Sequence, residues 1–335
     1  MLNRFRDLGR RGVAVTAAMA ATAAGAVALV GLDPDSPGTA SGAVSSPCGA
    51  PSAATIAGVD AVAARRIYAS ELHGRETRAD IGHITHSAAL LNALGGSNDA
   101  AVRAAVHGLV YAPHWHIVRL RVIRAGHVIS DIGGPYIVAP VTGTLRSHGR
   151  IVGRYVMSVQ DDLGYLKLVT RFIGIPLEIY RNGRPLMGTL AQPPARVSDG
   201  TRFGAGSHEY LPVVLNLHAF PKGILRVALM LPQPAAAGRT HQSCSAVRVS
   251  AWGSIAQHIA ARFKPLSSHY QDLVDVLRAI TGYPSYVTSG SRTVAGRGPS
   301  RSPSNGVVAY AGRSWSVFSW TSEPNVRVNL LTPPR

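Results

Sequence analysis

Residues 116–131 read HIVRLRVIRAGHVISD, and this stretch decides the fold class. Apolar side chains alternate with two arginines, Arg119 and Arg121, along its first half. Alternation with a period of two predicts a β-strand that has one buried face and one polar face. An Ala-Gly turn then leads into a second strand that ends at Asp131. The stretch therefore predicts an antiparallel hairpin at the start of a sheet.

Further strands are predicted downstream of this hairpin. They are expected at residues 136–141, 151–160, 175–181, 184–190, 210–219 and 224–231. The pair Asn182-Gly183 separates two of them and is the strongest hairpin signal in the chain, because both residues tolerate the positive φ angles of a type I′ turn. A helix is expected over 163–172 and an irregular loop over 191–207.

Helical periodicity dominates the region before the first strand. Apolar residues recur at helical spacing from Thr55 onward, and two glycines at 95–96 end this pattern. An Asn-Asp pair at 98–99 can cap a further short helix that reaches Leu109. The chain thus begins its folded part with helices and only then turns to strands.

The C-terminal part repeats this order on a smaller scale. Two helices are expected, with apolar stripes around Trp252 and Leu273, and the second ends at Gly282. Residues 289–305 are rich in Ser, Arg, Gly and Pro and are predicted to be mobile. Three short strands, at 307–311, 314–320 and 326–331, are expected to complete the chain.

These patterns predict an α+β protein with two modules. An N-terminal helical segment precedes an antiparallel-sheet module, both within residues 55–232, and a smaller α/β module occupies 245–335. Linkers rich in small residues and proline are expected at 33–54 and 233–244.

The first 32 residues have the character of a targeting segment. Four arginines and one aspartate lie in residues 1–12, and 20 uncharged, mostly Ala and Val residues follow over 13–32. As a helix this run would reach about 30 Å, the thickness of a hydrocarbon core. A basic flank before an apolar run predicts export of the rest of the chain. Two alternatives stay open: an anchor that holds an extracytoplasmic protein on the membrane through residues 13–32, or a cleaved signal peptide that releases a secreted one.

Composition narrows the class of protein further. Basic residues outnumber acidic ones 34 to 17, which gives a formal net charge of +17 and could attract anionic polymers or lipid headgroups. Nucleic acid is not an expected partner, since no basic stripe is interleaved with aromatic residues. Cys48 and Cys244 are too few for a disulfide scaffold or a Cys-rich zinc module. Export favours a disulfide between them, with two separate buried thiols as the alternative.

Two motifs carry a resemblance to a known family. They are DIGGPY over Asp131–Tyr136 and GRIVGRYVMSVQDDLGY over Gly149–Tyr165. With the helices and strands around them, residues 55–232 resemble the extracytoplasmic Cache sensor domains, which are PAS-like modules of bacterial signalling proteins. Residues 245–335 resemble a reduced second Cache unit.

The resemblance implies a twisted antiparallel sheet covered by helices, with a small-molecule pocket against the sheet. Cache proteins usually continue into a second membrane helix and a cytoplasmic output domain, neither of which this sequence contains. It also lacks a residue-by-residue match to the family's amino-acid-binding signature. We therefore expect the protein to act through a separate signalling partner.

The candidate ligand site lies on the polar side of the predicted sheet. Arg119 and Arg121 share one face of the first strand near Asp131, and arginine forks bind carboxylates in bidentate fashion. A small organic anion or an amino acid is therefore the expected ligand. The full predicted set is Trp115, Arg119, Arg121, Asp131, Tyr136, Tyr155, Ser158, Gln160, Asp161 and Asp162.

Each of these residues also has a plainer interpretation. The arginines and Asp131 can form an ion pair on a solvated face, which contributes little stability. The aromatic residues can belong to the core or to the rim of a site. The carboxylates at 161–162 can cap the helix that follows them.

Metal, cofactor and catalytic sites are not expected. The histidines of 83–86 and 114–116 lack an acidic or Cys partner at zinc spacing. The serine-hydrolase elbow, the phosphate-binding loop and the dinucleotide fingerprint are all missing. The expected function is a non-enzymatic, extracytoplasmic, small-molecule-binding sensor. The alternatives are a basic structural or adhesive envelope protein that binds anionic polymers, and an exported hydrolase.

Overall fold

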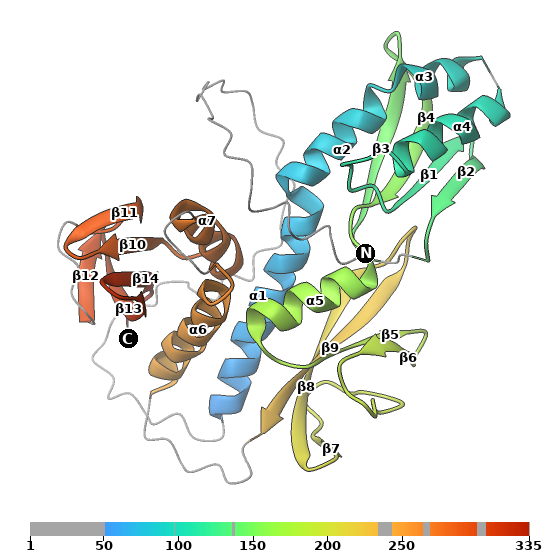
Figure 1. Cartoon of the computed structure of the whole chain (residues 1–335). Helices are drawn as coiled ribbons and strands as arrows, with labels where there is room; N and C mark the ends of the chain where they lie inside the picture. The colour runs from blue at the N-terminus through green and yellow to red at the C-terminus, as the bar shows by residue number, and fades with distance from the viewer. Residues whose placement is uncertain are drawn as a thin grey trace. The chain divides into compact units, whose positions relative to one another are not determined.

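The computed structural model describes residues 51–96, 98–135, 138–233, 243–263, 269–299 and 306–334, and it confirms an α+β fold (Figure 1). The helices are α1 (Pro51–His73), α2 (Arg75–Thr85), α3 (Ala88–Gly95), α4 (Asp99–Val110), α5 (Asp162–Ile173), α6 (Cys244–Ala260) and α7 (Tyr270–Thr281). The first nine strands are β1 (Arg119–Arg124), β2 (His127–Gly133), β3 (Pro140–Ser147), β4 (Arg150–Ser158), β5 (Leu177–Arg181), β6 (Arg184–Gly188), β7 (Phe203–Ala205), β8 (His208–His218) and β9 (Ile224–Gln233). The remaining strands are β10 (Ser285–Ser289), β11 (Arg292–Gly296), β12 (Gly306–Tyr310), β13 (Arg313–Glu323) and β14 (Val326–Thr332).

The strands form three antiparallel sheets. Sheet 1 has the order β2-β1-β4-β3, sheet 2 has β6-β5-β9-β8-β7, and sheet 3 has β11-β10-β14-β13-β12. In each sheet the last strand in sequence pairs with the first. Residues 55–232, predicted as one sheet module, therefore contain two separate sheets. The predicted boundary between this module and residues 245–335 stays a prediction.

Sheets 2 and 3 are built on the same local plan. α5, β5 and β6 in sheet 2 correspond to α7, β10 and β11 in sheet 3. The residue numbers at which the elements of each pair begin and end differ by the same amount. Both helices end on a glycine in the left-handed region, Gly174 with φ 84° and Gly282 with φ 71°. A residue with a side chain would be strained at these two positions, which explains the glycines.

Among the described residues, two large hydrophobic cores and two smaller clusters hold the sheets. Sheet 1 packs against α3 and α4 through residues such as Leu120, Met157 and Val106, all fully buried. The second core joins α1, α5, α6 and α7 to the inner faces of sheets 2 and 3, with Ile179 and Val328 among its buried members. Sheet 2 therefore has an inner face on this core, and its outer face carries a smaller buried cluster of Tyr180, Val197, Tyr210, Ala228 and Met230.

Most predicted elements are confirmed, and three differ. The Asn182-Gly183 turn has positive φ at both residues, as predicted. The third strand is β3 at 140–147 rather than 136–141, because the turn between β3 and β4 pairs Ser147 with Arg150. The segment 289–305, predicted to be mobile, contains β11, which pairs with β10. The 191–207 loop includes the three-residue strand β7.

None of the described helices combines the length and apolar character that a membrane-spanning segment requires. The predicted leader 1–32, the linker 33–54 up to residue 50 and Cys48 lie outside the described residues. Cys244 begins α6, and the part of the chain that the structure describes contains no free cysteine. The pairing of Cys48 with Cys244 stays a prediction.

Candidate functional site

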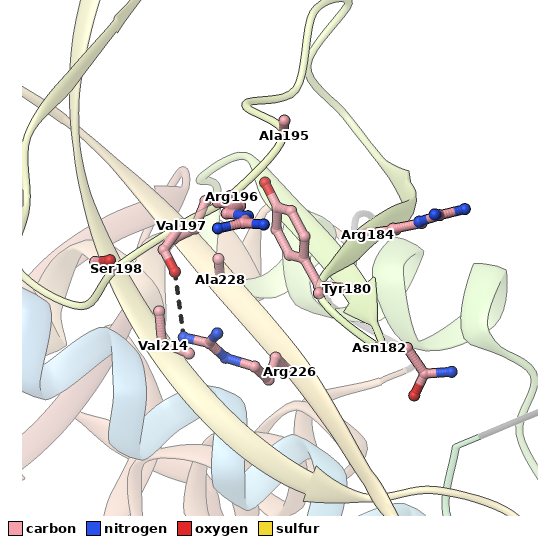
Figure 2. Close-up of a pocket in the computed structure, with 11 residues that line it drawn as sticks. Tyr180, Asn182, Arg184, Ala195, Arg196, Val197, Ser198, Val214, Arg226 and Ala228 are labelled. Carbon is pink, nitrogen blue, oxygen red and sulfur yellow. Dashed lines mark hydrogen bonds between the residues drawn. The ribbon is translucent and has the colours of Figure 1, made fainter.

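A cavity of about 540 Å³ opens on the outer face of sheet 2 (Figure 2). It lies beneath the 189–202 loop, which connects β6 to β7. The lining residues are Tyr180, Asn182, Gly183, Arg184, Ala195, Arg196, Val197, Ser198, Val214, Arg226 and Ala228. Its volume is within the range of small-molecule sites.

The floor of the cavity follows from strand alternation. Leu177 and Ile179 of β5 point into the core, so Tyr180 points to the outer face. The register then sets Arg226 of β9 directly opposite Tyr180, and Ala228 opposite Val214 of β8. A buried aromatic ring, two small apolar side chains and one arginine thus meet on one side of the sheet.

The 189–202 loop is fixed over this floor by polar contacts. The hydroxyl of Tyr180 donates to the carbonyl of Pro194 at 2.9 Å. Nη2 of Arg226 donates to the carbonyl of Val197 at 3.2 Å (Figure 2). The backbone N–H of Val214 donates to Oδ1 of Asp199 at 2.8 Å. Burial raises the pKa of Tyr180 to about 12, so its hydroxyl remains a donor at neutral pH.

The beginning of the loop is held by a buried carboxylate. Oε1 of Glu178 accepts the backbone N–H groups of Thr189 at 2.8 Å and of Leu190 at 2.7 Å. Oε2 of the same side chain is buried without a partner among the described residues. Burial raises the pKa of Glu178, although the two backbone N–H groups lower it in part.

The chemistry of the lining is that of an anion site. Arg184 comes from β6, Arg196 from the loop and Arg226 from β9, and all three are exposed to solvent. None of the described lining residues is acidic. Guanidinium groups bind carboxylate and phosphate with charge-assisted, paired hydrogen bonds. The cavity can therefore hold an anion whose carbon skeleton rests on the apolar floor.

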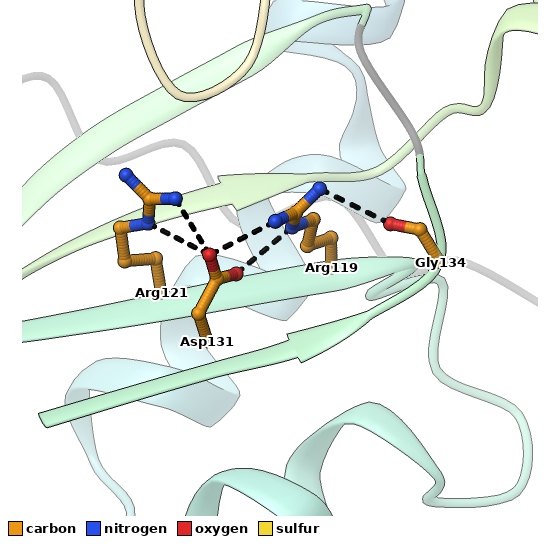
Figure 3. A network of polar contacts seen from close by, with 4 residues as sticks. All are labelled: Arg119, Arg121, Asp131 and Gly134. Atoms are coloured by element: carbon orange, nitrogen blue, oxygen red, sulfur yellow. Dashed lines mark hydrogen bonds and ion pairs between the residues drawn. The ribbon is translucent and has the colours of Figure 1, made fainter. Parts of the chain in front are cut away.

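Arg119, Arg121 and Asp131, predicted as a ligand site, lie together on the face of sheet 1 opposite α3 and α4 (Figure 3). Asp131 accepts from Nε and Nη2 of Arg119 at 2.8 and 2.9 Å, and from Nε and Nη2 of Arg121 at 3.0 and 2.6 Å. Burial raises the pKa of Asp131, but the hydrogen bonds from both arginines outweigh it and leave the pKa lowered. The plainer interpretation is correct in the Arg–Asp ion pair but not in the solvated face, because these side chains are only 20–23% exposed, and a ligand-binding role stays a prediction.

The same arginines also hold the tip of the β8–β9 hairpin. The ring of Phe220 is buried, and the guanidinium carbons of Arg119 and Arg121 lie 4.7 and 5.6 Å from its centroid. A bridge between Val138 and Ala219 lies beside this contact. The cation–π geometry indicates that the two arginines and Asp131 join sheet 1 to the hairpin.

Replacing Asp131 with alanine should lower the free energy of unfolding by about 1–3 kcal/mol, because two half-buried arginines would lose their shared counter-charge. Chemical denaturation at neutral pH measures this change. Asp272→Ala, at an exposed carboxylate of α7, is the matched control. Equal stability of the Asp131 and Asp272 variants would show that the ion pair contributes nothing.

The other described residues of the predicted site make separate local contacts. Tyr155 is buried over Gly143, which faces it across the strand pair. Trp115 stacks on His83 with ring centroids 4.1 Å apart. Ser158 is buried and donates to the carbonyl of Val138 at 2.6 Å.

Residues 160–162 lie where β4 passes into α5. Asp161 is the N-cap of α5 and accepts from the backbone N–H of Gly164, so the capping interpretation describes it. Asp162 accepts from the N–H of Leu163 at 3.1 Å, and burial raises its pKa. Nε2 of Gln160 donates to Oε2 of Glu71 at 3.1 Å. Tyr136 lies outside the described residues.

Sequence reasoning missed the cavity on sheet 2, although two signals were present. The 191–207 loop is longer than most hairpin connections, and long ordered loops are often functional. Arginines flank it on both sides in sequence, at 184 and 226. Neither signal shows that the loop folds back over the sheet, because that depends on the register of β8 and β9.

Metal binding finds no support in the described residues, which contain no group of three or more His, Cys, Asp or Glu side chains placed to hold an ion.

Comparison with known proteins assigns no family. No protein-family model matches the chain, and no curated protein matches it. Among solved structures, the chain is similar to the periplasmic domain of LuxQ from Vibrio cholerae, with 11% sequence identity and a TM-score of 0.33 over 54% of this chain and 98% of that chain. This TM-score is too low to assign a fold or a function, so the Cache resemblance stays a prediction.

Proposed function

We propose that this protein binds a small organic anion in the cavity beneath the 189–202 loop and does not transform it. In this proposal it is an exported, sensor-like binding protein that acts through a partner. The ligand lies on the floor of Tyr180, Val214 and Ala228, and its acidic groups contact the arginines.

The observation that supports this proposal is that three arginines line one cavity and that none of its described lining residues is a carboxylate. Arg184, Arg196 and Arg226 come from a strand, a loop and another strand. By contrast, Arg119 and Arg121 already share Asp131 as a counter-ion, so an incoming carboxylate would have to displace it. The sheet 2 cavity is therefore the better candidate for the anion site.

The lining also favours binding over catalysis. Its polar groups are guanidinium, amide, hydroxyl and phenol, and the phenol of Tyr180 already donates to a carbonyl. These groups hold an anion well, but they do not form the nucleophile–base pair that hydrolysis of an ester or peptide uses.

A thermal-shift screen of the full chain against carboxylates, amino acids and phosphate esters tests the proposal. A ligand should raise the melting temperature by mass action. Each of Arg196→Gln and Arg226→Gln should weaken binding about 10- to 100-fold, since a hydrogen bond to a charged group contributes about 1.5–3 kcal/mol.

Arg327→Gln is the matched control. Arg327 is exposed on β14 and lies opposite Thr288 of β10. These two positions in sheet 3 correspond to those of Arg226 and Tyr180, which lie opposite each other in sheet 2. Equal loss of affinity in all three variants would place the ligand elsewhere. The absence of any shift across the panel in folded protein would refute the proposal.

A further inference from the structure

The hairpin of β3 and β4 carries a second group of basic residues, separate from the sheet 2 cavity. Arg146, His148, Arg150 and Arg154 are all exposed. No Asp or Glu occurs in residues 132–160. The hairpin is therefore positively charged along both of its strands.

These side chains are not neutralised by neighbours. Within the described part of the chain, none of the four forms an ion pair. Nη1 of Arg146 donates only to the carbonyl of Gly149, at 3.1 Å. Arg124 of the adjacent β1 differs, because it pairs with Asp99 of α4. Most of the hydrogen-bonding capacity of the hairpin arginines is thus available to a partner.

A cavity of about 550 Å³ lies beside the hairpin, between β3 and the junction of α2 with α3. Four of its lining side chains carry hydroxyl or amide groups: Thr85, Asn92, Thr144 and Ser147. Arg146 and His148 line it from the hairpin side and His86 from the helix side, and no described lining residue is acidic. The cavity offers both cations and neutral hydrogen-bonding groups.

His86 has a defined proton arrangement at this cavity. Its Nδ1 lies 2.9 Å from the carbonyl oxygen of Gly82, which can only accept. Nδ1 therefore carries a hydrogen, and Nε2 is the ring atom that remains for another partner.

From this arrangement we infer that the β3–β4 hairpin and its cavity bind an acidic polysaccharide. The arginines contact the carboxylates of the polymer, and the hydroxyl and amide side chains contact its sugar hydroxyls. Arg146 lies on β3 and Arg150 and Arg154 lie on β4, so the charges are spread over both strands of the hairpin, and a polymer with repeated charges can contact them in succession.

Other anionic partners fit the surface less well. A single-stranded nucleic acid is usually held by exposed aromatic rings that stack on its bases, and the described lining of this cavity contains no aromatic residue other than histidine. A membrane surface needs several exposed apolar anchors, whereas the hairpin exposes one large apolar side chain, Ile151.

Binding of the full chain to polygalacturonate, measured at several salt concentrations, tests the inference. Arg146→Gln/Arg150→Gln should weaken binding at least tenfold at low salt and reduce its salt dependence, because two ionic contacts are lost. Arg146→Gln/Arg150→Gln should leave the thermal shift that a small anion produces unchanged, because neither residue lines the sheet 2 cavity, so failure here is distinguishable from failure of the small-anion proposal.

Arg292→Gln/Arg313→Gln is the charge-matched control. Arg313 follows the turn Ala311-Gly312, whose φ angles are 51° and 75°. Arg150 likewise follows the turn His148-Gly149, whose φ angles of 48° and 79° are similar. Thermal unfolding of both double variants checks that they fold. Equal weakening by both variants, no binding to the polymer, or tighter binding to phosphatidylglycerol vesicles or single-stranded DNA would overturn the inference.

Discussion

Replacing Gly188 with alanine should lower the free energy of unfolding by about 2–4 kcal/mol. The new methyl group would overlap the carboxylate of Glu178, which faces Gly188 directly across the β5–β6 pair. Glu178 cannot move away cheaply, since it is fully buried and accepts the N–H groups of Thr189 and Leu190. Displacing it would leave two donors and a carboxylate without partners and would loosen the beginning of the 189–202 loop.

Urea unfolding of single and double variants measures this effect. Glu178→Ala removes the carboxylate, so adding Gly188→Ala to it should cost less than adding Gly188→Ala to the wild type. Gly204→Ala in β7 is the matched control, because its added methyl group would meet no atom within 4 Å. If the two glycine variants were equally stable, the predicted overlap would be wrong.

Replacing Asp60 with asparagine should remove much of the pH dependence of stability between about pH 4 and pH 7. Asp60 lies on α1 and is 5% exposed. Burial raises its pKa from 3.8 to about 7. Between these two values the unfolded chain has lost the proton that the folded chain retains, so stability falls as the pH rises through this window.

The expected size follows from the shift in pKa. About three pKa units correspond to roughly 4 kcal/mol, and partial relaxation around the charge should reduce the measured loss to about 2–4 kcal/mol. Chemical denaturation of wild type and Asp60→Asn from pH 4 to pH 8 measures it. In the variant, the free energy of unfolding should still fall with rising pH, but less steeply, because burial also raises the pKa of Glu71 to about 6. Parallel pH profiles for wild type and variant would contradict the prediction.

Local patterns in the sequence were sufficient to predict most elements. The alternation around Arg119 and Arg121 is a property of neighbouring residues, and β1 and β2 pair as that alternation predicts. The same holds for Asn182-Gly183, whose backbone preference specifies the turn between β5 and β6. Segment β11 was missed because the Ser, Gly, Arg and Pro residues around Thr293 and Val294 dominate the composition of 289–305, and pairing with β10 stabilises the strand.

The site depended on information that neighbouring residues do not carry. Sequence reasoning placed Arg119 and Arg121 on one face with Asp131 close by, which is correct, and offered an Arg–Asp pair beside a ligand site, but it could not choose between the two or show that Phe220 would pack against the arginines. Phe220 is far from them in sequence and arrives through the β8–β9 hairpin.

By itself, the sequence determined the α+β class, the order of helices and strands, the main turns and the excess of positive charge, since these depend on spacing and composition over a few residues. Only the tertiary structure shows that the strands within residues 119–233 form two sheets, that Arg184, Arg196 and Arg226 line one cavity, and that Phe220 packs on Arg119 and Arg121. These features depend on strand register and loop closure, which bring together side chains that are distant along the chain.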